Sequence, residues 1–333
     1  MMGVTPNLDA RERGPTIAMS IVDLRQVSSR QIEPLLAEEA QHWREELRWD
    51  YRPSLNLIKK FVDAKSLAGC VAMENGRALG YSFYVVEDRK GLIGGLHVSA
   101  QSPQLVVARQ LLSGMLETLR AIPGIERIEA QLIPFGCGFE GVLAELGFGI
   151  YPRQFMLLEL DRATLPPTPL LSPGLVLERW DDRQFAACAR LIQLAYANHT
   201  DGEINDQYRS ESGALKFLKN IVILPGCGQF LAPASFVLRA PHSHELVGAV
   251  LTSTVANLTG HTTQICVMPG YQRHGLGRRL IAATISALRE RGYTALSLTV
   301  TSSNLNAVRL YDKIGFTTIK TFTAGVWLPG GHG

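Results

Sequence analysis

The sequence has few cysteines, and none of them follows a pattern that binds zinc or builds a disulfide framework. Its 333 residues include five cysteines, an odd number, and they are widely spaced without a Cys-x-x-Cys pair. We therefore interpret them as reduced thiols buried among apolar side chains. The cysteine content excludes a disulfide-rich scaffold, and we expect no metal site.

Long apolar runs and a strong charge are also missing. No run of about 18 apolar residues is present that could span a bilayer as a helix. Residues 1–19 lack the apolar core of a signal peptide. The 33 basic and 30 acidic side chains leave a net charge of +3, which is too small for a general nucleic-acid binder. We expect a folded cytoplasmic protein with neither a nucleic-acid nor a membrane partner.

The chain is long enough for two domains, and a proline-rich segment separates its halves. This segment, residues 161–174, contains four prolines, which favour an extended backbone: Pro166, Pro167, Pro169 and Pro173. We therefore predict a mobile tail over residues 1–19, a first domain over 20–160, a linker over 161–174 and a second domain over 175–333.

The two halves contain glycines at a constant spacing, which indicates an internal repeat. Gly80 and Gly248 lie 168 positions apart, and so do Gly147 and Gly315. Between these glycines, each half has the pattern of two strands, a long helix, a strand and a short helix. We predict an α/β (α+β) fold with two tandem copies. Each copy is expected to be a mixed, mostly antiparallel twisted sheet flanked by helices.

A glycine pair marks a candidate ligand site in the second half. Thr262 to Val267 is predicted as a strand, and Leu276 to Arg291 as an amphipathic helix. Gly275 and Gly277 stand between strand and helix, where a backbone without side chains can approach a ligand closely. The free N–H groups at a helix N-terminus attract a pyrophosphate. The Walker and dinucleotide fingerprints do not fit, which argues against ATP and NAD.

Two motifs resemble the GNAT superfamily of acyl-CoA-dependent N-acyltransferases. Gln272-Arg273-His274-Gly275-Leu276-Gly277 matches the family pattern Gln/Arg-x-x-Gly-x-Gly/Ala. Residues 304–316 are similar to its pattern Asn-x-x-Ala-x-x-Leu-Tyr-x-x-x-Gly-Phe. The resemblance implies a tandem protein of this family that uses acetyl-CoA as acyl donor without a metal. The expected reaction is direct attack on the thioester by a primary amine of a small molecule or peptide.

The resemblance also implies roles for individual residues. The backbone N–H of Val267 is the expected donor to the thioester oxygen, and Tyr311 the expected general acid for the leaving thiolate. The backbone of Ile265, Cys266 and Val267 is expected to pair with the pantetheine arm. The remaining expected cofactor-binding residues are Gln272, Arg273, His274, Gly275, Leu276, Gly277, Arg278, Asn304 and Ala307.

The general base and the acceptor are left open by the sequence. No glutamate that could serve as the general base occurs from Leu246 to Arg289. The remaining options for the base are His261, which we expect in a turn, and a water relay. The segment from His199 to Tyr208 has three carboxylates that either attract an ammonium group or belong to a solvated loop. Acyl chain length, and whether the chain is a monomer or a homodimer, also stay open.

The first half lacks the residues of both motifs. At the same offset, Gly275 and Gly277 correspond to Val107 and Arg109. Four more motif positions, Gln272, Asn304, Ala307 and Tyr311, correspond to Gln104, Gly136, Phe139 and Leu143. We predict a degenerate, non-catalytic first copy. A noncatalytic acyl-CoA sensor and a structural interaction protein are the alternatives to an active second copy.

Overall fold

The computed structural model describes residues 19–134, 138–165, 174–224, 226–240, 243 and 245–330. Residues 1–18 of the predicted tail and residues 166–173 of the predicted linker lie outside the described residues. None of the described helices is long and apolar enough to cross a membrane.

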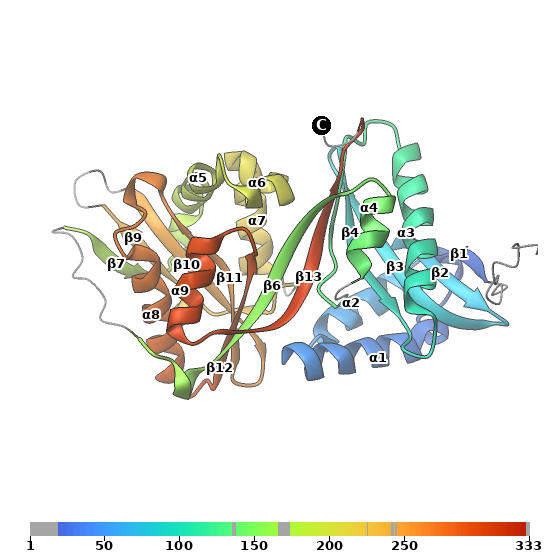
Figure 1. Cartoon of the computed structure of the whole chain (residues 1–333), viewed down its shortest axis with the longest axis horizontal. Coiled ribbons are helices and arrows are strands. Elements are labelled where there is room, and N and C mark those ends of the chain that lie inside the picture. The colour runs from blue at the N-terminus through green and yellow to red at the C-terminus, as the bar shows by residue number, and fades with distance from the viewer. Residues whose placement is uncertain are drawn as a thin grey trace, which may run out of the picture.

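The two halves share one order of elements, to which the second half adds α6 and β8 (Figure 1). The first half contains β1 (Ser20–Asp23), α1 (Ser29–Leu47), α2 (Arg52–Asp63), β2 (Ala68–Glu74), β3 (Arg77–Glu87), β4 (Lys90–Val98), α3 (Gln104–Ala121), β5 (Arg127–Gln131), α4 (Phe139–Glu145) and β6 (Gly149–Glu159). The second contains β7 (Val176–Arg179), α5 (Phe185–Tyr196), α6 (Thr200–Ile204), α7 (Glu211–Ile223), β8 (Gln229–Phe230), β9 (Phe236–Arg239), β10 (Leu246–Ala256), β11 (Thr259–Val267), α8 (Leu276–Arg289), β12 (Ala295–Thr301), α9 (Leu305–Ile314) and β13 (Thr317–Trp327).

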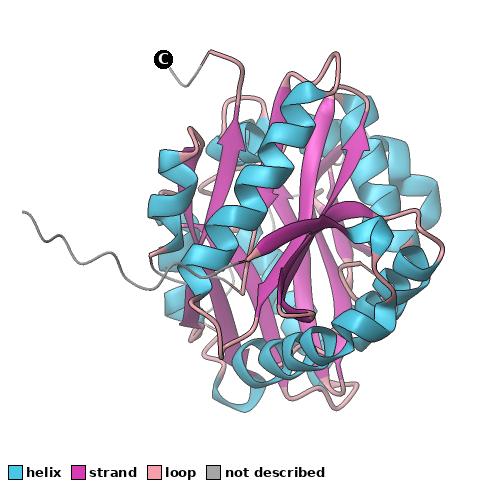
Figure 2. Ribbon diagram, turned by 90° about the vertical axis from the view of Figure 1, so that its right-hand side faces the viewer, coloured by secondary structure: helices cyan, strands magenta, loops and turns pink. Residues whose placement is uncertain are grey.

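The strands of both halves join in one sheet whose order is β1-β2-β3-β4-β5-β13-β6-β12-β11-β10-β9-β7. Most neighbours are antiparallel, while β4 and β5, like β11 and β12, are parallel. Helices cover both faces of the sheet (Figure 2). This is the mixed, mostly antiparallel sheet with flanking helices that the sequence predicts.

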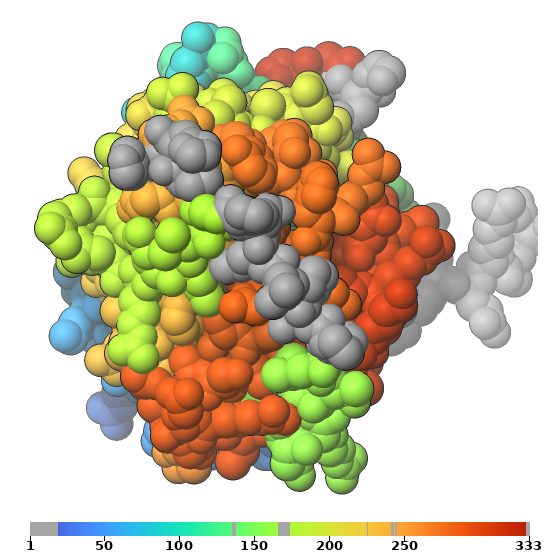
Figure 3. Space-filling model, turned by 90° about the vertical axis from the view of Figure 1, so that its left-hand side faces the viewer, coloured from blue at the N-terminus to red at the C-terminus, as the bar shows by residue number. Residues whose placement is uncertain are grey.

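The last strands of the two halves are exchanged. β6 pairs with β12 of the second half, and β13 pairs with β5 of the first half. The two exchanged strands also pair with each other along most of their length and cross at the middle of the molecule (Figure 1). The sequence suggests a domain boundary at residue 160, but the sheet continues across it. The end of the molecule in Figure 3 nevertheless consists mainly of second-half segments.

The core follows from the apolar faces of the long helices. In α8 the buried residues recur at helical spacing, so that Leu276, Leu280 and Leu288 face the strands of the second half. In α3 a corresponding face, with Leu111, Met115 and others, packs on the first half. Each half thus has its own apolar core on either side of the exchanged strands.

The parallel strand pairs separate after a few residues. β11 pairs with β12 only from Thr259 opposite Ala295 to Thr262 opposite Leu298. Beyond that point the remaining residues of β11 have no ladder partner on the β12 side. This divergence opens a V-shaped gap, and the functional site lies there.

Candidate active site

A cavity of about 1220 Å³ occupies the gap between β11 and β12. The second half lines it with the end of β11, the loop before α8, the first turn of α8 and one side of α9. The first half contributes a further wall, whose residues are Trp43, Trp49, Tyr51, Gly94, Gln131, Ile133 and Arg153. Both halves therefore build the site.

The backbone at the end of β11 presents polar groups to this cavity. The N–H of Met268 donates to the carbonyl of Val247 on β10 over 2.9 Å. Antiparallel pairing alternates along a strand, so the N–H of Val267 points away from β10, toward the gap. The carbonyl of Val267 accepts a hydrogen bond from Gln272 Nε2 at 3.1 Å. The N–H of Val267 is thus free to donate to a ligand.

The backbone groups of the two preceding residues of β11 point in opposite directions. The same alternation directs the backbone of Ile265 toward the gap, where its carbonyl accepts a 3.1 Å hydrogen bond from the Tyr196 hydroxyl. The backbone of Cys266 faces Ala249 on β10, and its thiol is buried. The backbone of Cys266 is thus directed to the sheet, and its pairing with the pantetheine arm stays a prediction.

The loop before α8 forms an uncapped helix N-terminus at the cavity. Gly275 is the N-cap residue with φ of 76°, in the left-handed region that glycine adopts without strain, and no side chain caps the helix. A Cβ placed on Gly277 would meet only Leu310 Cδ2, at 3.7 Å, so open space lies on this side of the first turn. Nε of Arg278 is buried without a hydrogen-bond partner among the described residues. These groups fit an anion such as a pyrophosphate.

The other residues of the first motif have different surroundings. Arg273, with φ of 64°, and His274 are exposed at the rim of the cavity. Leu276 is 4% exposed and packs in the core, so only its backbone can contact a ligand. The motif therefore combines a backbone cradle with one anchoring apolar side chain.

Tyr311 lies on α9 with its side chain against the cavity. It is 5% exposed, and its ring centroid lies 5.6 Å from that of Phe316. The hydroxyl forms no hydrogen bond with the described residues. Burial raises the pKa of Tyr311 well above its usual value near 10, and the negative charge of Asp201 acts in the same direction. The phenol is therefore protonated at neutral pH and can donate a proton.

Asn304 has a local role that the sequence did not reveal. Its Oδ1 accepts from the N–H of Ala307 at 3.2 Å and so caps α9. Its Nδ2 lies 3.2 Å from Nε2 of His199. Ala307 itself lines the cavity. The side chain of Asn304 thus positions α9 and His199, and contact with a pantetheine arm stays a prediction.

The three carboxylates of the segment before α7 are divided between the site and the interface of the halves. Asp201 lines the cavity and accepts a hydrogen bond from Thr301 Oγ1. Glu203 accepts from the Tyr151 hydroxyl at 3.3 Å, and Asp206 forms an ion pair with Lys90 of the first half. Among these three carboxylates, Asp201 alone borders the cavity.

His261 is buried within β11, and its expected position in a turn is therefore wrong. Its Nδ1 lies 2.9 Å from Ser297 Oγ. The rings of Trp49 and Phe155 lie 4.9 and 5.6 Å away by centroid. Burial lowers the pKa of His261 to about 3, so the ring is neutral at pH 7. The strand reaches farther toward its start than the sequence pattern indicates.

The corresponding region of the first half is filled with side chains. Val107 and Leu143 are fully buried, and Phe139 is 2% exposed, in the core around α3. Arg109 forms an ion pair with Glu145 on the surface. Gly136 lies outside the described residues. This packing supports the prediction of a non-catalytic first copy.

Comparisons with known proteins agree with the motifs. Residues 197–316 match the family model described as the acetyltransferase (GNAT) family. Mycothiol acetyltransferase of Renibacterium salmoninarum is 24% identical over 209 residues, which cover 61% of this chain and 58% of that protein. Ribosomal protein bS18-alanine N-acetyltransferase of Escherichia coli K12 is 48% identical over 52 residues, 16% of this chain and 35% of that protein. The matches thus span less than two thirds of these relatives.

The fold comparison covers most of the chain. A solved tandem GNAT protein from the clavulanic acid biosynthesis pathway superposes with a TM-score of 0.57 at 15% identity, covering 95% of this chain and 100% of that one. A GCN5-related N-acetyltransferase from Sphaerobacter thermophilus gives 0.58 at 15% identity, over 79% and 80%. Residues 197–316 are thus similar to the acetyltransferase (GNAT) family, and both motifs lie within this range. The chain as a whole has the tandem GNAT fold.

Proposed function

We propose that the second half transfers the acetyl group of acetyl-CoA to a primary amine of a small molecule or peptide. The observation that carries this proposal is the meeting of three groups in one cavity. These are the N–H of Val267, the hydroxyl of Tyr311 and the N-terminus of α8. Among the described residues, no group of three or more His, Cys, Asp or Glu side chains could hold a metal ion.

Each of the three groups has a role in such a transfer. The first turn of α8 and Arg278 hold the pyrophosphate, and the pantetheine arm follows the free edge of β11. The N–H of Val267 then stabilises the oxyanion that forms when the amine nitrogen attacks the thioester carbon. As the C–S bond breaks, Tyr311 donates its proton to the thiolate sulfur, and the proton that the attacking nitrogen then loses restores the phenol.

We assign Asp201 to the binding of the acceptor amine. Its carboxylate borders the cavity, is held by Thr301 and acts electrostatically on Tyr311. An ammonium group bound there lies beside the reacting centre. Before attack the amine loses a proton, so that the products are an amide, the free CoA thiol and one released proton.

The test is release of the CoA thiol from acetyl-CoA in the presence of a panel of amines. Acetylated amine, identified by its added mass, in equal amount to the thiol supports the proposal. Binding of acetyl-CoA without transfer to any amine would favour the noncatalytic sensor, and no binding would favour the interaction protein. The cytoplasmic location and the oligomeric state stay predictions.

A further inference from the structure

Arg153 reaches the cavity because of the strand exchange. It lies on β6 of the first half, opposite Thr301 of β12 in the sheet register. Its Nη1 donates to Gln131 Oε1 at 2.7 Å, and its Nη2 lies 3.5 Å from Thr299 Oγ1. Its Nε is buried without a hydrogen-bond partner among the described residues. Arg153 lines the cavity with part of its hydrogen-bonding capacity unused.

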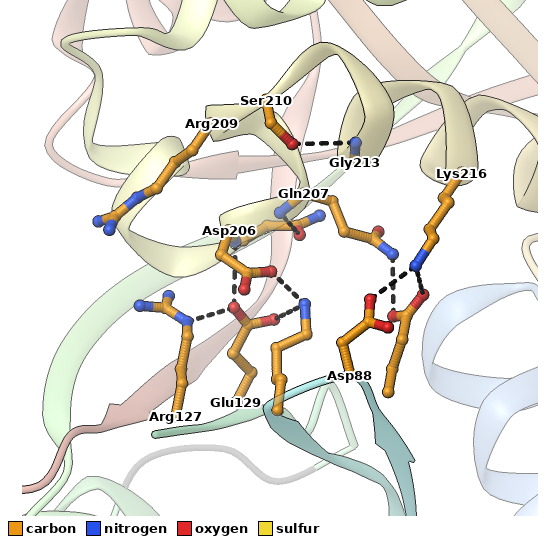
Figure 4. A network of polar contacts seen from close by, with 12 residues as sticks. Asp88, Arg127, Glu129, Asp206, Gln207, Arg209, Ser210, Gly213 and Lys216 are labelled. Atoms are coloured by element: carbon orange, nitrogen blue, oxygen red, sulfur yellow. Dashed lines mark hydrogen bonds and ion pairs between the residues drawn. The ribbon is translucent and has the colours of Figure 1, made fainter. Parts of the chain in front are cut away.

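The charge of Arg153 has an aromatic neighbour but no carboxylate, since its guanidinium carbon lies 6.0 Å from the centroid of the Phe322 ring. Within the described parts of the chain, no carboxylate forms an ion pair with it. Arg127, on β5, which is separated from β6 by β13, shows the contrast. Its Nε pairs with Glu129 Oε1 at 2.5 Å, and Glu129 also pairs with Lys90 at 3.3 Å (Figure 4). Arg153 is half-buried, and an anion bound in the cavity would supply the charge-assisted hydrogen bonds that its guanidinium lacks.

The side chains of Arg153 and Asp201 contact the same face of β12. Arg153 contacts Thr299, and Asp201 contacts Thr301, two residues farther along the strand. Alternate residues of a strand share one face and lie about 7 Å apart. Both charges act on the Tyr208 phenol. Burial is the main cause that raises the pKa of Tyr208, the charge of Asp201 adds to this rise, and the charge of Arg153 opposes it. A cationic and an anionic subsite thus lie within the length of one small acceptor.

The aromatic side chains of the first half complete this end of the cavity. Trp43 stacks on Tyr51 at a centroid distance of 4.3 Å, and Trp49 lies edge-on to Trp43 at 5.5 Å. These rings line the same cavity as Arg153, and apolar walls strengthen a charge-assisted hydrogen bond formed within it. A single guanidinium matches the one negative charge of a carboxylate better than the roughly two of a phosphate monoester.

We propose that the acceptor is an amine that carries a carboxylate, in the class of amino acids and short peptides. Arg153 binds its carboxylate, and Asp201 receives its ammonium group next to the thioester. This inference rests on the proposed function and adds the substrate class. It also gives the exchanged strand a role, since Arg153 comes from the half without the acetyltransferase motifs.

The experiment compares each acceptor with its uncharged counterpart. Amino acids, ω-amino acids and dipeptides are assayed beside their carboxamides, with phosphoethanolamine as the phosphate probe. We expect the KM of a carboxylate acceptor to be at least about tenfold below that of its amide. Arg153→Gln is expected to remove this difference and to leave the KM for acetyl-CoA unchanged, while Arg153→Lys restores part of it. Free amino acids and dipeptides, ranked by kcat/KM, identify the source of the carboxylate.

Controls separate this inference from the proposed function. Arg190→Gln, at an exposed arginine on α5, should behave like the wild type. Circular dichroism and acetyl-CoA affinity verify that the variants fold. Equal KM values for acids and amides, a preference for phosphoethanolamine, or an equal loss for both in Arg153→Gln overturns the inference.

If the wild type acetylates none of these amines, calorimetry with the CoA-loaded chain decides. Arg153-dependent binding of the acids then supports the inference without the reaction, and its absence refutes it.

Discussion

The side-chain amide of Gln272 donates a 3.1 Å hydrogen bond to the backbone carbonyl of Val267. This contact ties the loop before α8 to the end of β11 and satisfies the carbonyl of Val267. Because β11 has no ladder partner on its β12 side here, the N–H of Val267 can donate to the oxyanion in the proposed reaction. The first residue of the motif thus fixes the strand end, while the proposal assigns the glycines to the cofactor.

Tyr311→Phe tests the general acid. The Tyr311 hydroxyl has no partner among the described residues, so its removal should leave the fold intact. We expect kcat to fall about 100-fold with little change in acetyl-CoA affinity, measured by thiol release and calorimetry. Tyr293→Phe is the matched control, because its hydroxyl bonds Thr254 outside the cavity. An unchanged kcat in Tyr311→Phe would exclude this role.

Asn304→Ala separates stability from chemistry at the start of α9. The substitution removes the cap on the N–H of Ala307, and we expect the free energy of unfolding to fall by about 1 kcal/mol in urea titrations. Asn304→Asp should keep the cap and the stability. Equal loss of stability in both variants would show that Asn304 is not needed as a cap.

The strand exchange predicts that the halves depend on each other. Each half has its last strand beside a strand of the other, so neither segment 19–165 nor segment 174–330 has a complete sheet alone. We expect each segment to be unfolded or aggregated alone, and the pair to form a folded 1:1 complex when produced together. Size-exclusion chromatography and circular dichroism measure this. Two separately folded, monomeric segments would contradict the prediction.

His261 makes the stability depend on pH. Its folded-state pKa of about 3 lies below the unfolded value of 6.5, so the unfolded chain binds the extra proton between these values. The free energy of unfolding therefore falls as the pH falls below 6.5, with a slope approaching about 1.4 kcal/mol per pH unit. His261→Gln should show a smaller slope in urea titrations between pH about 7 and about 5. Parallel curves would contradict a neutral, buried His261.

The second half could be predicted well because its signals are local. The helix period of α8 and the two motifs are written in consecutive residues, and the repeat spacing of 168 relates β6 to β13 residue by residue. The packing of Val107, Phe139 and Leu143 also agrees with the missing glycines and tyrosine of the first half.

The contributions of the first half could not be predicted, because they depend on pairing between distant strands. Nothing local in β6 distinguishes pairing with β12 from pairing within its own half, so Arg153 gave no signal of a site. The aromatic wall at Trp49 reaches the cavity only through that exchange. Likewise, the separation of Asp201 from Glu203 and Asp206 depends on the partners that the first half offers.

Calorimetric titration of acetyl-CoA tests the central claim most directly. We expect one site per chain, lost in Gly277→Glu, whose carboxylate would enter the pyrophosphate site. Gly277→Ala, for which there is space, should retain binding. Arg109→Glu, the same charge at the corresponding position of the first half, should bind like the wild type. Two sites per chain, no site, or unchanged binding in a folded Gly277→Glu variant would contradict the central claim. That claim is that the second half alone binds acetyl-CoA, at one site.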